Sequence, residues 1–202
     1  MKFITFWIAL VCIVLFVLQT AVPVTTDVLV LSQDSFMQPW RFVSSIFIHG
    51  SLIHLVSNLF ALILFGFILE KVIGSRKMTI VFFVSGIVAN LIAVNFYNSS
   101  LGASGAIYGI MGCLNILRPK MVVWAYSLPM PMFLAAIVWV VVGIFGVFMP
   151  SNTGHIAHLS GIAVGVLFGI YYYKTYRQEP EHKIRLHVPD SYMNEWEDVH
   201  MR

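Results

Sequence analysis

The feature that most constrains this chain is a series of long apolar stretches that charged residues avoid. Of its 202 residues, 59% are hydrophobic and only 10% are charged, whereas about 25% of the residues in an average soluble domain are charged. A helix needs roughly 20 mostly apolar residues to cross the hydrocarbon core of a bilayer, because it rises only 1.5 Å per residue. The sequence therefore predicts an all-α membrane protein that crosses the bilayer several times.

Six of these stretches are candidate spans. The first resembles a signal peptide, but its apolar run is too long and no small-x-small cleavage site follows it. We expect residues 1–174 to form one six-transmembrane helical bundle and residues 175–202 to form a polar cytoplasmic tail. The predicted spans are residues 3–22, 52–69, 78–96, 104–117, 130–149 and 156–173.

The positions of lysine and arginine predict the topology, because these residues favour cytoplasmic loops. With the N-terminus placed inside, eleven of the twelve lysines and arginines fall in cytoplasmic segments, and only Arg41 falls outside. This asymmetry supports six crossings with both termini in the cytoplasm. The net charge of +3 is thus a topology signal and does not indicate nucleic-acid binding.

The fourth stretch, 104–117, is too short to cross the membrane alone. Its fourteen residues make about 21 Å of helix, and Arg118 and Lys120 hold one end at the cytoplasmic face. The other end, at Ser104, therefore lies roughly 10 Å below the outer edge of the hydrocarbon. Residues 98–104 must dip into the membrane as irregular backbone, which is tolerated only inside protein or beside a water-filled cavity.

Polar side chains gather at the same depth on other predicted spans. His54 and Asn58 are four residues apart near the outer end of the second span, so they share a helix face. His158 lies about one turn into the sixth span, and His49 and His155 lie at the rims. A single such residue often only bonds across a helix pair. Several at one depth on three helices indicate a functional site, because polar groups in spans are costly.

Ser104 and His158 are the predicted nucleophile and general base. A serine hydroxyl is a poor nucleophile at neutral pH until a base accepts its proton. Faces of small residues on both helices would let the two backbones come close, and Tyr108, one turn below Ser104, is expected to pack under the imidazole. The small residues are Gly161, Gly165 and Gly169 after His158, and Gly105 and Gly109 after Ser104.

A third residue often orients the histidine of such a pair. The predicted spans contain no aspartate, and Glu70 lies at the cytoplasmic end of the second span. Asp27 and Asp34, in the first outer loop, remain candidate partners of His158. The pattern favours a Ser-His dyad over a triad.

Acyl transfer also needs hydrogen-bond donors for the developing oxyanion. The backbone N–H of Ser104 has no partner in its own helix because it stands at the N-terminus. His54 and Asn58 would add side-chain donors from the second span. Gly102, which lacks a side chain, would let a substrate carbonyl come close.

These motifs resemble those of the rhomboid family of intramembrane proteases. A lone G-x-S-G motif arises by chance, but the ordered set covers about residues 36–170 and is specific. The matching segments are Gly102-Ala-Ser-Gly105 with Tyr108 for G-x-S-G, His54-Leu-Val-Ser-Asn58 for H-x-x-x-N, Ala157-His-Leu-Ser-Gly161 with Gly165 for A-H-x-x-G, and Trp40-Arg41 for a W-R pair.

The resemblance implies a minimal, six-span prokaryotic form in the cell membrane, with its active site toward the outer face. It implies a serine endopeptidase that uses no metal or other cofactor and cleaves transmembrane substrates, single-span proteins above all. Ser104 and His158 resemble the nucleophile and base, and His54, Asn58 and the Ser104 N–H resemble the oxyanion hole.

The resemblance also implies roles for residues outside the dyad. Gly102 resembles the glycine that admits the scissile bond. Trp40 and Arg41 resemble a structural pair in a loop that rests in the outer leaflet. Residues 149–155, with the top of the fifth span, resemble the cap and lateral gate.

Three segments carry less information. We expect a form without a sizeable N-terminal cytoplasmic domain, in contrast to the best-known bacterial members. The connection 118–131 is apolar yet interrupted by prolines, and is expected to form a β-like segment beneath the bundle. The tail is expected to be disordered. The sequence specifies neither the oligomeric state nor the physiological substrate.

Three other classes of function remain open at this stage. A metal-dependent enzyme or transporter would use His49, His54, His155 and His158, although no H-E-x-x-H motif or carboxylate ligand accompanies them. A small transporter or channel would need an inverted repeat or an intramembrane acid pair, and neither is present. A catalytically inactive relative that only binds transmembrane segments would be expected to lack the serine or the base.

Overall fold

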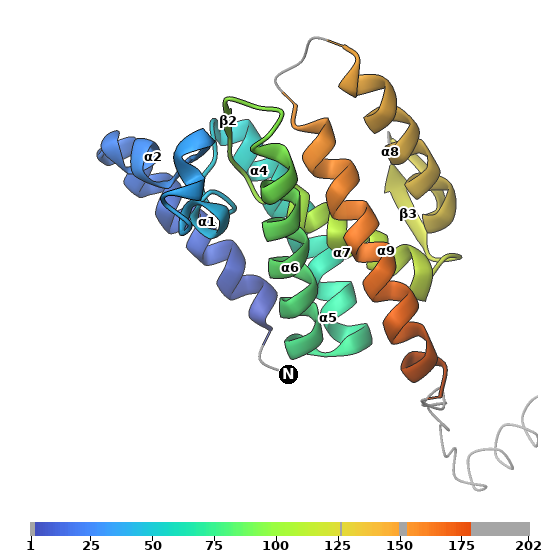
Figure 1. The fold of residues 1–202 in the computed structure, drawn as a ribbon. Coiled ribbons are helices and arrows are strands. Elements are labelled where there is room, and N and C mark those ends of the chain that lie inside the picture. Colours follow the sequence, from blue (N-terminus) through green and yellow to red (C-terminus); the bar gives the residue numbers. More distant parts are fainter. Residues whose placement is uncertain (1–2, 126, 150–152, 179–202) are drawn as a thin grey trace, which may run out of the picture.

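Helices dominate the part of the chain that this computed structural model describes, residues 3–125, 127–149 and 153–178. The long helices run side by side as a bundle (Figure 1). They are α1 (Ile4–Ala21), α4 (Leu52–Ala61), α5 (Phe67–Ile73), α6 (Ser75–Ala93), α7 (Ser104–Leu117), α8 (Met132–Val147) and α9 (His155–Gln178). A π-turn, η2 (Leu62–Gly66), joins α4 to α5 without a break.

Four helices within the described residues are long and apolar enough to cross a membrane: Ile4–Ala21, Leu52–Ile73, Ser75–Ala93 and His155–Thr175. Ser104–Leu117 and Met132–Val147 are shorter apolar helices. The chain is therefore a helical membrane protein, as its composition predicts.

Several helices begin or end at other residues than the predicted spans. The differences occur where a charged residue or a proline was taken as the boundary of a span. The second span does not end at residue 69, because α5 continues through Glu70 to Ile73. The third begins at Ser75, directly after Gly74. The fifth begins at Met132, because the two residues before it belong to a strand. The last helix extends to Gln178, and residues 179–202 of the expected tail lie outside the described residues.

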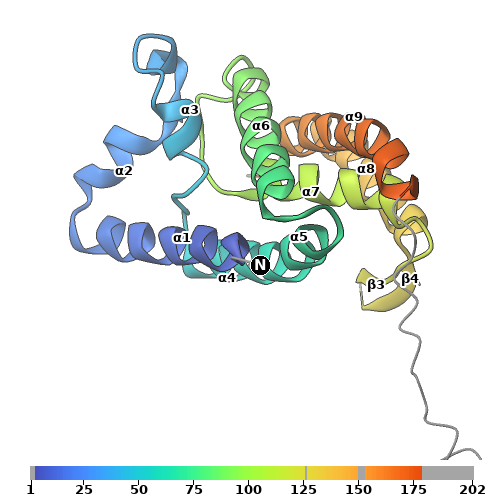
Figure 2. The same ribbon diagram turned by 90° about the horizontal axis from the view of Figure 1, so that it is seen from below.

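Helix α7 lies in the middle of the bundle, between α6 and α9 (Figures 1 and 2). Ten of its fourteen residues are buried, which explains how so short a helix is stably held in the membrane. On the α9 side, a Cβ at Gly161 would collide with the carbonyl oxygen of Gly105, and a Cβ at Gly165 with that of Gly109. The glycines of α9 thus bring the two backbones into contact.

Gly105 and Gly109 lie against α9, as expected, and also against a second helix, α6. A Cβ at Gly105 would lie 2.8 Å from the Ala89 Cβ of α6, and one at Gly109 would collide with Ser85 of the same helix. These two glycines present their backbone carbonyls to α9 and their missing side chains to α6. Helix α7 therefore packs closely against both α6 and α9.

The segment between α1 and α4 folds into short elements that contact the residues just before α7. They are α2 (Val24–Leu29), β1 (Leu31–Ser32), a 3-10 turn η1 (Gln33–Phe36) and α3 (Arg41–Ser44). Strand β1 pairs antiparallel with β2 (Ser99–Ser100), just before Ser104. Arg41 is buried and donates to the Val30 carbonyl at 2.8 Å and to Gln38 Oε1 at 2.6 Å. Trp40 is half exposed and donates to the Val28 carbonyl at 3.3 Å.

The connection between α7 and α8 is a β-hairpin, in agreement with the expected β-like segment. Strand β3 (Val122–Ala125) pairs antiparallel with β4 (Leu128–Pro131). Ser127, in the turn, has a positive φ of 64°. The side chains of β3 alternate between exposed and buried, as in a strand with one packed face.

Glu70 binds the N-terminus of α1 and is fully buried. Its carboxylate accepts from the Ile4 N–H at 2.7 Å and from the Thr5 N–H and hydroxyl at 3.1 and 2.6 Å. The Ser75 hydroxyl donates to the same carboxylate at 2.6 Å. Because the N-cap Phe3 supplies no side-chain acceptor, Glu70 satisfies amides that would otherwise lack partners.

We expect Glu70→Ala to destabilise the protein by about 2–4 kcal/mol, because it leaves several buried donors without an acceptor. The measurement is thermal unfolding of the purified protein in detergent. Lys71→Ala is the matched control, since Lys71 is adjacent but exposed. Equal unfolding temperatures for the two variants would contradict the capping role.

Candidate active site

The first residue of α7 and the first turn of α9 meet at a hydrogen bond. The Nε2 atom of His158 lies 2.8 Å from the Oγ of Ser104, although the two residues are 54 positions apart in the sequence. Ser104 begins its helix after Gly102, whose N–H donates to the Ser45 carbonyl at 2.8 Å. The first-loop segment therefore fixes the backbone from which Ser104 projects.

The ring of His158 is held by an aromatic neighbour. Tyr108 stacks on it with ring centroids 4.3 Å apart and an angle of 21° between the planes. Trp139 of α8 meets Tyr108 edge to face at 6.5 Å. This stacking limits rotation of the imidazole and keeps Nε2 directed at Ser104.

The start of α9 is held in a second way. The backbone N–H of Ile156 donates to the Tyr97 hydroxyl at 3.1 Å. His155, the first residue of α9, lies 6.2 Å from His158 between ring centroids. Among the residues that the structure describes, no carboxylate hydrogen-bonds to His158, and Asp27 and Asp34 are exposed in the first loop.

The position of Gly102 requires a glycine for two reasons, its backbone conformation and the closeness of the His54 ring. Its φ of +113° is one that L residues with side chains rarely adopt, and a Cβ there would lie 2.7 Å from the Cε1 and Nε2 atoms of His54. From the sequence, Gly102 is expected to admit a substrate carbonyl. The structure adds that this glycine leaves room for His54.

His54 and Asn58 face the same cavity as Ser104 from α4. The Ser51 hydroxyl caps α4 by accepting from the His54 N–H at 3.1 Å. Asn58 is buried, and its Nδ2 donates to the His54 carbonyl at 2.9 Å. An amide nitrogen carries two protons, so one N–H of Asn58 remains for another acceptor.

His49 lies behind His54 and is almost completely buried. The two rings are 5.1 Å apart and meet edge to face. Gln19 of α1 fixes the His49 backbone from both sides, since its Oε1 accepts from the His49 N–H at 3.0 Å and its Nε2 donates to the His49 carbonyl at 3.3 Å. Burial lowers the pKa of His49 to about 4, with the neighbouring His54 as the second cause, so this ring is neutral at pH 7.

One cavity, about 1170 Å³ in volume, contains the residues that the sequence analysis selected for chemistry. Trp40 and Arg41 lie outside it, in the first loop, and Gly161 and Gly165 lie in the contact between α7 and α9. The selected residues that line the cavity are His54, Asn58, Gly102, Ser104, Tyr108 and His158.

Several residues that line this cavity were not predicted from the sequence, among them Asn90 and Trp139. Asn90 is buried and donates to the Phe42 carbonyl at 2.9 Å and to the Ser45 Oγ at 3.0 Å, which ties α6 to the first loop. It is a polar residue inside a predicted span, the same signal that selected Asn58. Trp139 gives no such signal, because it lies within an uninterrupted apolar run.

The four histidines considered as metal ligands form two separate ring pairs, His49 with His54 and His155 with His158. Within the described parts of the chain, no three His, Cys, Asp or Glu side chains are grouped closely enough to hold a metal ion.

Comparison with known proteins identifies the family of the chain. Residues 37–175 match the family model described as the Rhomboid domain. The rhomboid protease GlpG of Yersinia pseudotuberculosis is 26% identical over 175 residues, which is 83% of this chain and 62% of the relative. The rhomboid protease GlpG of Haemophilus influenzae is 28% identical over 139 residues, covering 68% of this chain and 70% of the relative.

The chain spans only about 62% of the length of the Yersinia relatives that it matches. The family match itself, over residues 37–175, covers well over half of the chain and includes every residue that lines the cavity. The chain therefore belongs to the rhomboid family of membrane proteins.

Proposed function

We propose that this protein is an intramembrane serine endopeptidase that cleaves transmembrane segments of membrane proteins near the outer face of the membrane. The observation that carries the proposal is the 2.8 Å separation between His158 Nε2 and Ser104 Oγ. This is hydrogen-bond distance, the geometry that a general base needs to activate a serine. The relatives named above are described as rhomboid proteases.

In the proposed first step, Ser104 Oγ attacks the carbonyl carbon of the scissile peptide bond while its proton passes to His158 Nε2. The tetrahedral intermediate then collapses, the C–N bond breaks, and His158 returns the proton to the leaving amine. A water molecule attacks the resulting ester by the same route in reverse and releases Ser104. The pair acts as a dyad, with Tyr108 in place of a carboxylate as the group that orients the ring.

The oxyanion would be bound by donors on two helices. The Ser104 N–H is at the N-terminus of α7, where no side chain caps the helix. His54 and Asn58, on α4, line the same cavity as Ser104, and the second N–H of Asn58 is available for this role. The donors are part of a rigid framework, so they need little reorganisation when charge develops.

The proposed topology has six crossings, with both termini in the cytoplasm and the cavity open toward the outer face. The short length of α7 and the non-helical backbone of residues 98–103, which includes the two-residue strand β2, support it. Such backbone is tolerated at membrane depth only beside protein or water. The cavity would supply that water, which would also serve for hydrolysis. Residues 150–152 of the expected cap lie outside the described residues.

Labelling with a fluorophosphonate in detergent tests the assignment of the dyad. We expect wild-type protein to be labelled and Ser104→Ala not to be labelled. In both Ser104→Ala and His158→Ala, cleavage of a model single-span substrate should fall by roughly several orders of magnitude, as in other Ser-His enzymes. Equal labelling of Ser104→Ala and wild type would refute Ser104 as the nucleophile.

The role of Asn58 as one of several oxyanion donors predicts a smaller effect. Asn58→Ala should lower kcat by about 10–1000-fold, with little change in KM. The measurement is steady-state cleavage of the same substrate. A change confined to KM would show that Asn58 binds the ground state and the transition state equally, and would contradict its role as an oxyanion donor.

Gly102→Ala is expected to lower activity by roughly 10–100-fold, since it strains a positive-φ position and displaces the His54 ring. Gly50→Ala is the matched control, because a Cβ at Gly50 would make only an ordinary 3.5 Å contact with Leu101. Substrate cleavage and thermal unfolding are measured together for both variants. Comparable activity in the two would contradict the steric account of Gly102.

A further inference from the structure

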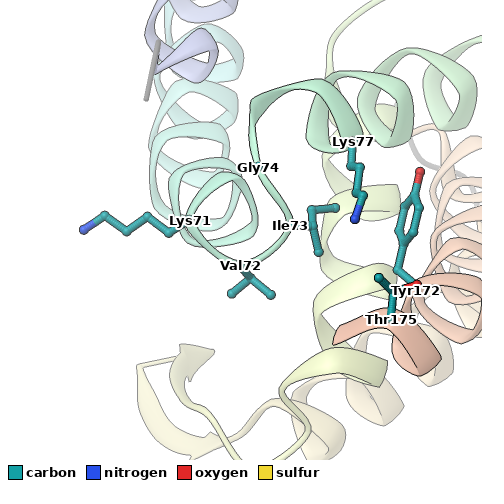
Figure 3. A pocket seen from close by; sticks show the side chains of 7 residues that line it. All are labelled: Lys71, Val72, Ile73, Gly74, Lys77, Tyr172 and Thr175. Carbon is teal, nitrogen blue, oxygen red and sulfur yellow. The ribbon is translucent and has the colours of Figure 1, made fainter. Parts of the chain in front are cut away.

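A second cavity opens at the end of the bundle opposite Ser104 and His158. It has a volume of about 270 Å³ and lies between the end of α5, the start of α6 and the end of α9 (Figure 3). Along α9, the step from His158 to Tyr172, which lines the cavity, corresponds to about 21 Å of helix. The cavity is therefore separate from the candidate active site.

One lysine supplies the charge inside this cavity. Lys77, in the first turn of α6, points into the space between Ile73 and the ring of Tyr172 (Figure 3). Its ammonium lies 5.4 Å from the centroid of that ring, and among the described residues it makes no ion pair. Lys71 also lines the cavity but points away, with its ammonium 4.3 Å from the Phe67 ring.

The charges around the cavity are positive. None of the residues that line it is acidic. Glu70 is adjacent in the sequence, but its carboxylate is buried and hydrogen-bonded to Ile4, Thr5 and Ser75. Arg76 and Lys174 are exposed beside the lining residues. Within residues 3–125, 127–149 and 153–178, Lys77 is thus a cation without a counter-ion, and the exposed charges beside it are positive.

The remaining walls combine polar donors with apolar surface. The hydroxyl of Thr175 and the backbone at Gly74 lie at the cavity. Helix α6 begins without a side-chain cap, and the first of its amides with a helical partner is that of Met78, which bonds to Gly74. The earlier amides are left for an external acceptor, preferably an anion. Ile73 and the Tyr172 ring give an apolar side.

We propose that this cavity binds the phosphate group of an anionic phospholipid, with Lys77 as its principal ligand. The cavity lies at the ends of membrane helices, where headgroups are found, and basic pockets between such helices on the cytoplasmic side bind anionic headgroups. Its volume lies just below the range of about 300–1,000 Å³ that is typical of pockets for larger ligands. The apolar side suits the glycerol and upper acyl chain of a lipid and not a free phosphate ion.

The test measures lipid binding to the full-length protein in detergent by native mass spectrometry. The probes are phosphatidylglycerol, phosphatidylcholine and inorganic phosphate as a competitor. We expect selective retention of phosphatidylglycerol, weakened roughly tenfold by Lys77→Gln and less than about twofold by Arg76→Gln. Arg76 is the matched control, because it is the next residue, carries the same charge and does not line the cavity.

Three results would overturn the proposal. Equal losses in Lys77→Gln and Arg76→Gln would show only diffuse electrostatic attraction. Equal retention of the two lipids would show no headgroup selectivity. Displacement of phosphatidylglycerol by an equal concentration of inorganic phosphate would show a free-anion site. If Lys77→Gln fails to fold, Thr175→Phe fills the cavity without a change of charge, and wild-type lipid binding by that variant would equally exclude this cavity.

Discussion

The contact between the backbones of α7 and α9 is the constraint on which the rest of the structure depends. Gly161 and Gly165 have no room for even a methyl group against the carbonyl oxygens of Gly105 and Gly109. Small residues are the means by which membrane helices pack when both lipid and protein are apolar, and weak C–H···O contacts accompany such packing. His158 is three residues before Gly161, so this contact sets the distance from its ring to Ser104. Because misplacement of about 1 Å can cost 100-fold in rate, the glycines matter to the proposed chemistry without touching a substrate.

Much of this arrangement could be predicted from the sequence, because it depends on glycines and polar residues that stand out within apolar spans. The glycine spacing predicted the helix pair, and the length of residues 104–117 predicted where α7 begins. Polar residues that share one depth predicted which side chains line the cavity. Each signal is a residue type that is costly or unusual in a membrane span, so it stands out without knowledge of the fold.

Sequence reasoning missed features at positions where an apolar residue can face either lipid or the protein interior. In a soluble helix, apolar periodicity shows which face is buried, but α8 is apolar on all sides, so nothing marks Trp139 as facing the cavity. Glu70 was taken as the end of a span. Its partners in α1 are about 65 positions away in the sequence, so the residues around Glu70 do not indicate that its carboxylate is buried and hydrogen-bonded. The π-turn Leu62–Gly66 could not be predicted either, and it changes the faces that later residues present. This turn directs Phe65 toward Trp139 and places Gly66 against Thr5 of α1.

The unequal packing on the two sides of the α4–α5 helix bears on how a substrate would reach Ser104. On the α1 side, the Glu70 carboxylate and the close approach of Gly66 to Thr5 hold the helices together. On the α8 side, the contact at the level of the π-turn is the aromatic pair of Phe65 and Trp139, with centroids 6.0 Å apart. Only four of the sixteen residues of α8 are buried, against ten of fourteen in α7. Elements with few buried contacts open at the lowest cost in free energy. Helix α8 is thus packed less tightly than α7, and the assignment of residues 149–155 with the top of the fifth span as cap and lateral gate stays a prediction drawn from the family resemblance.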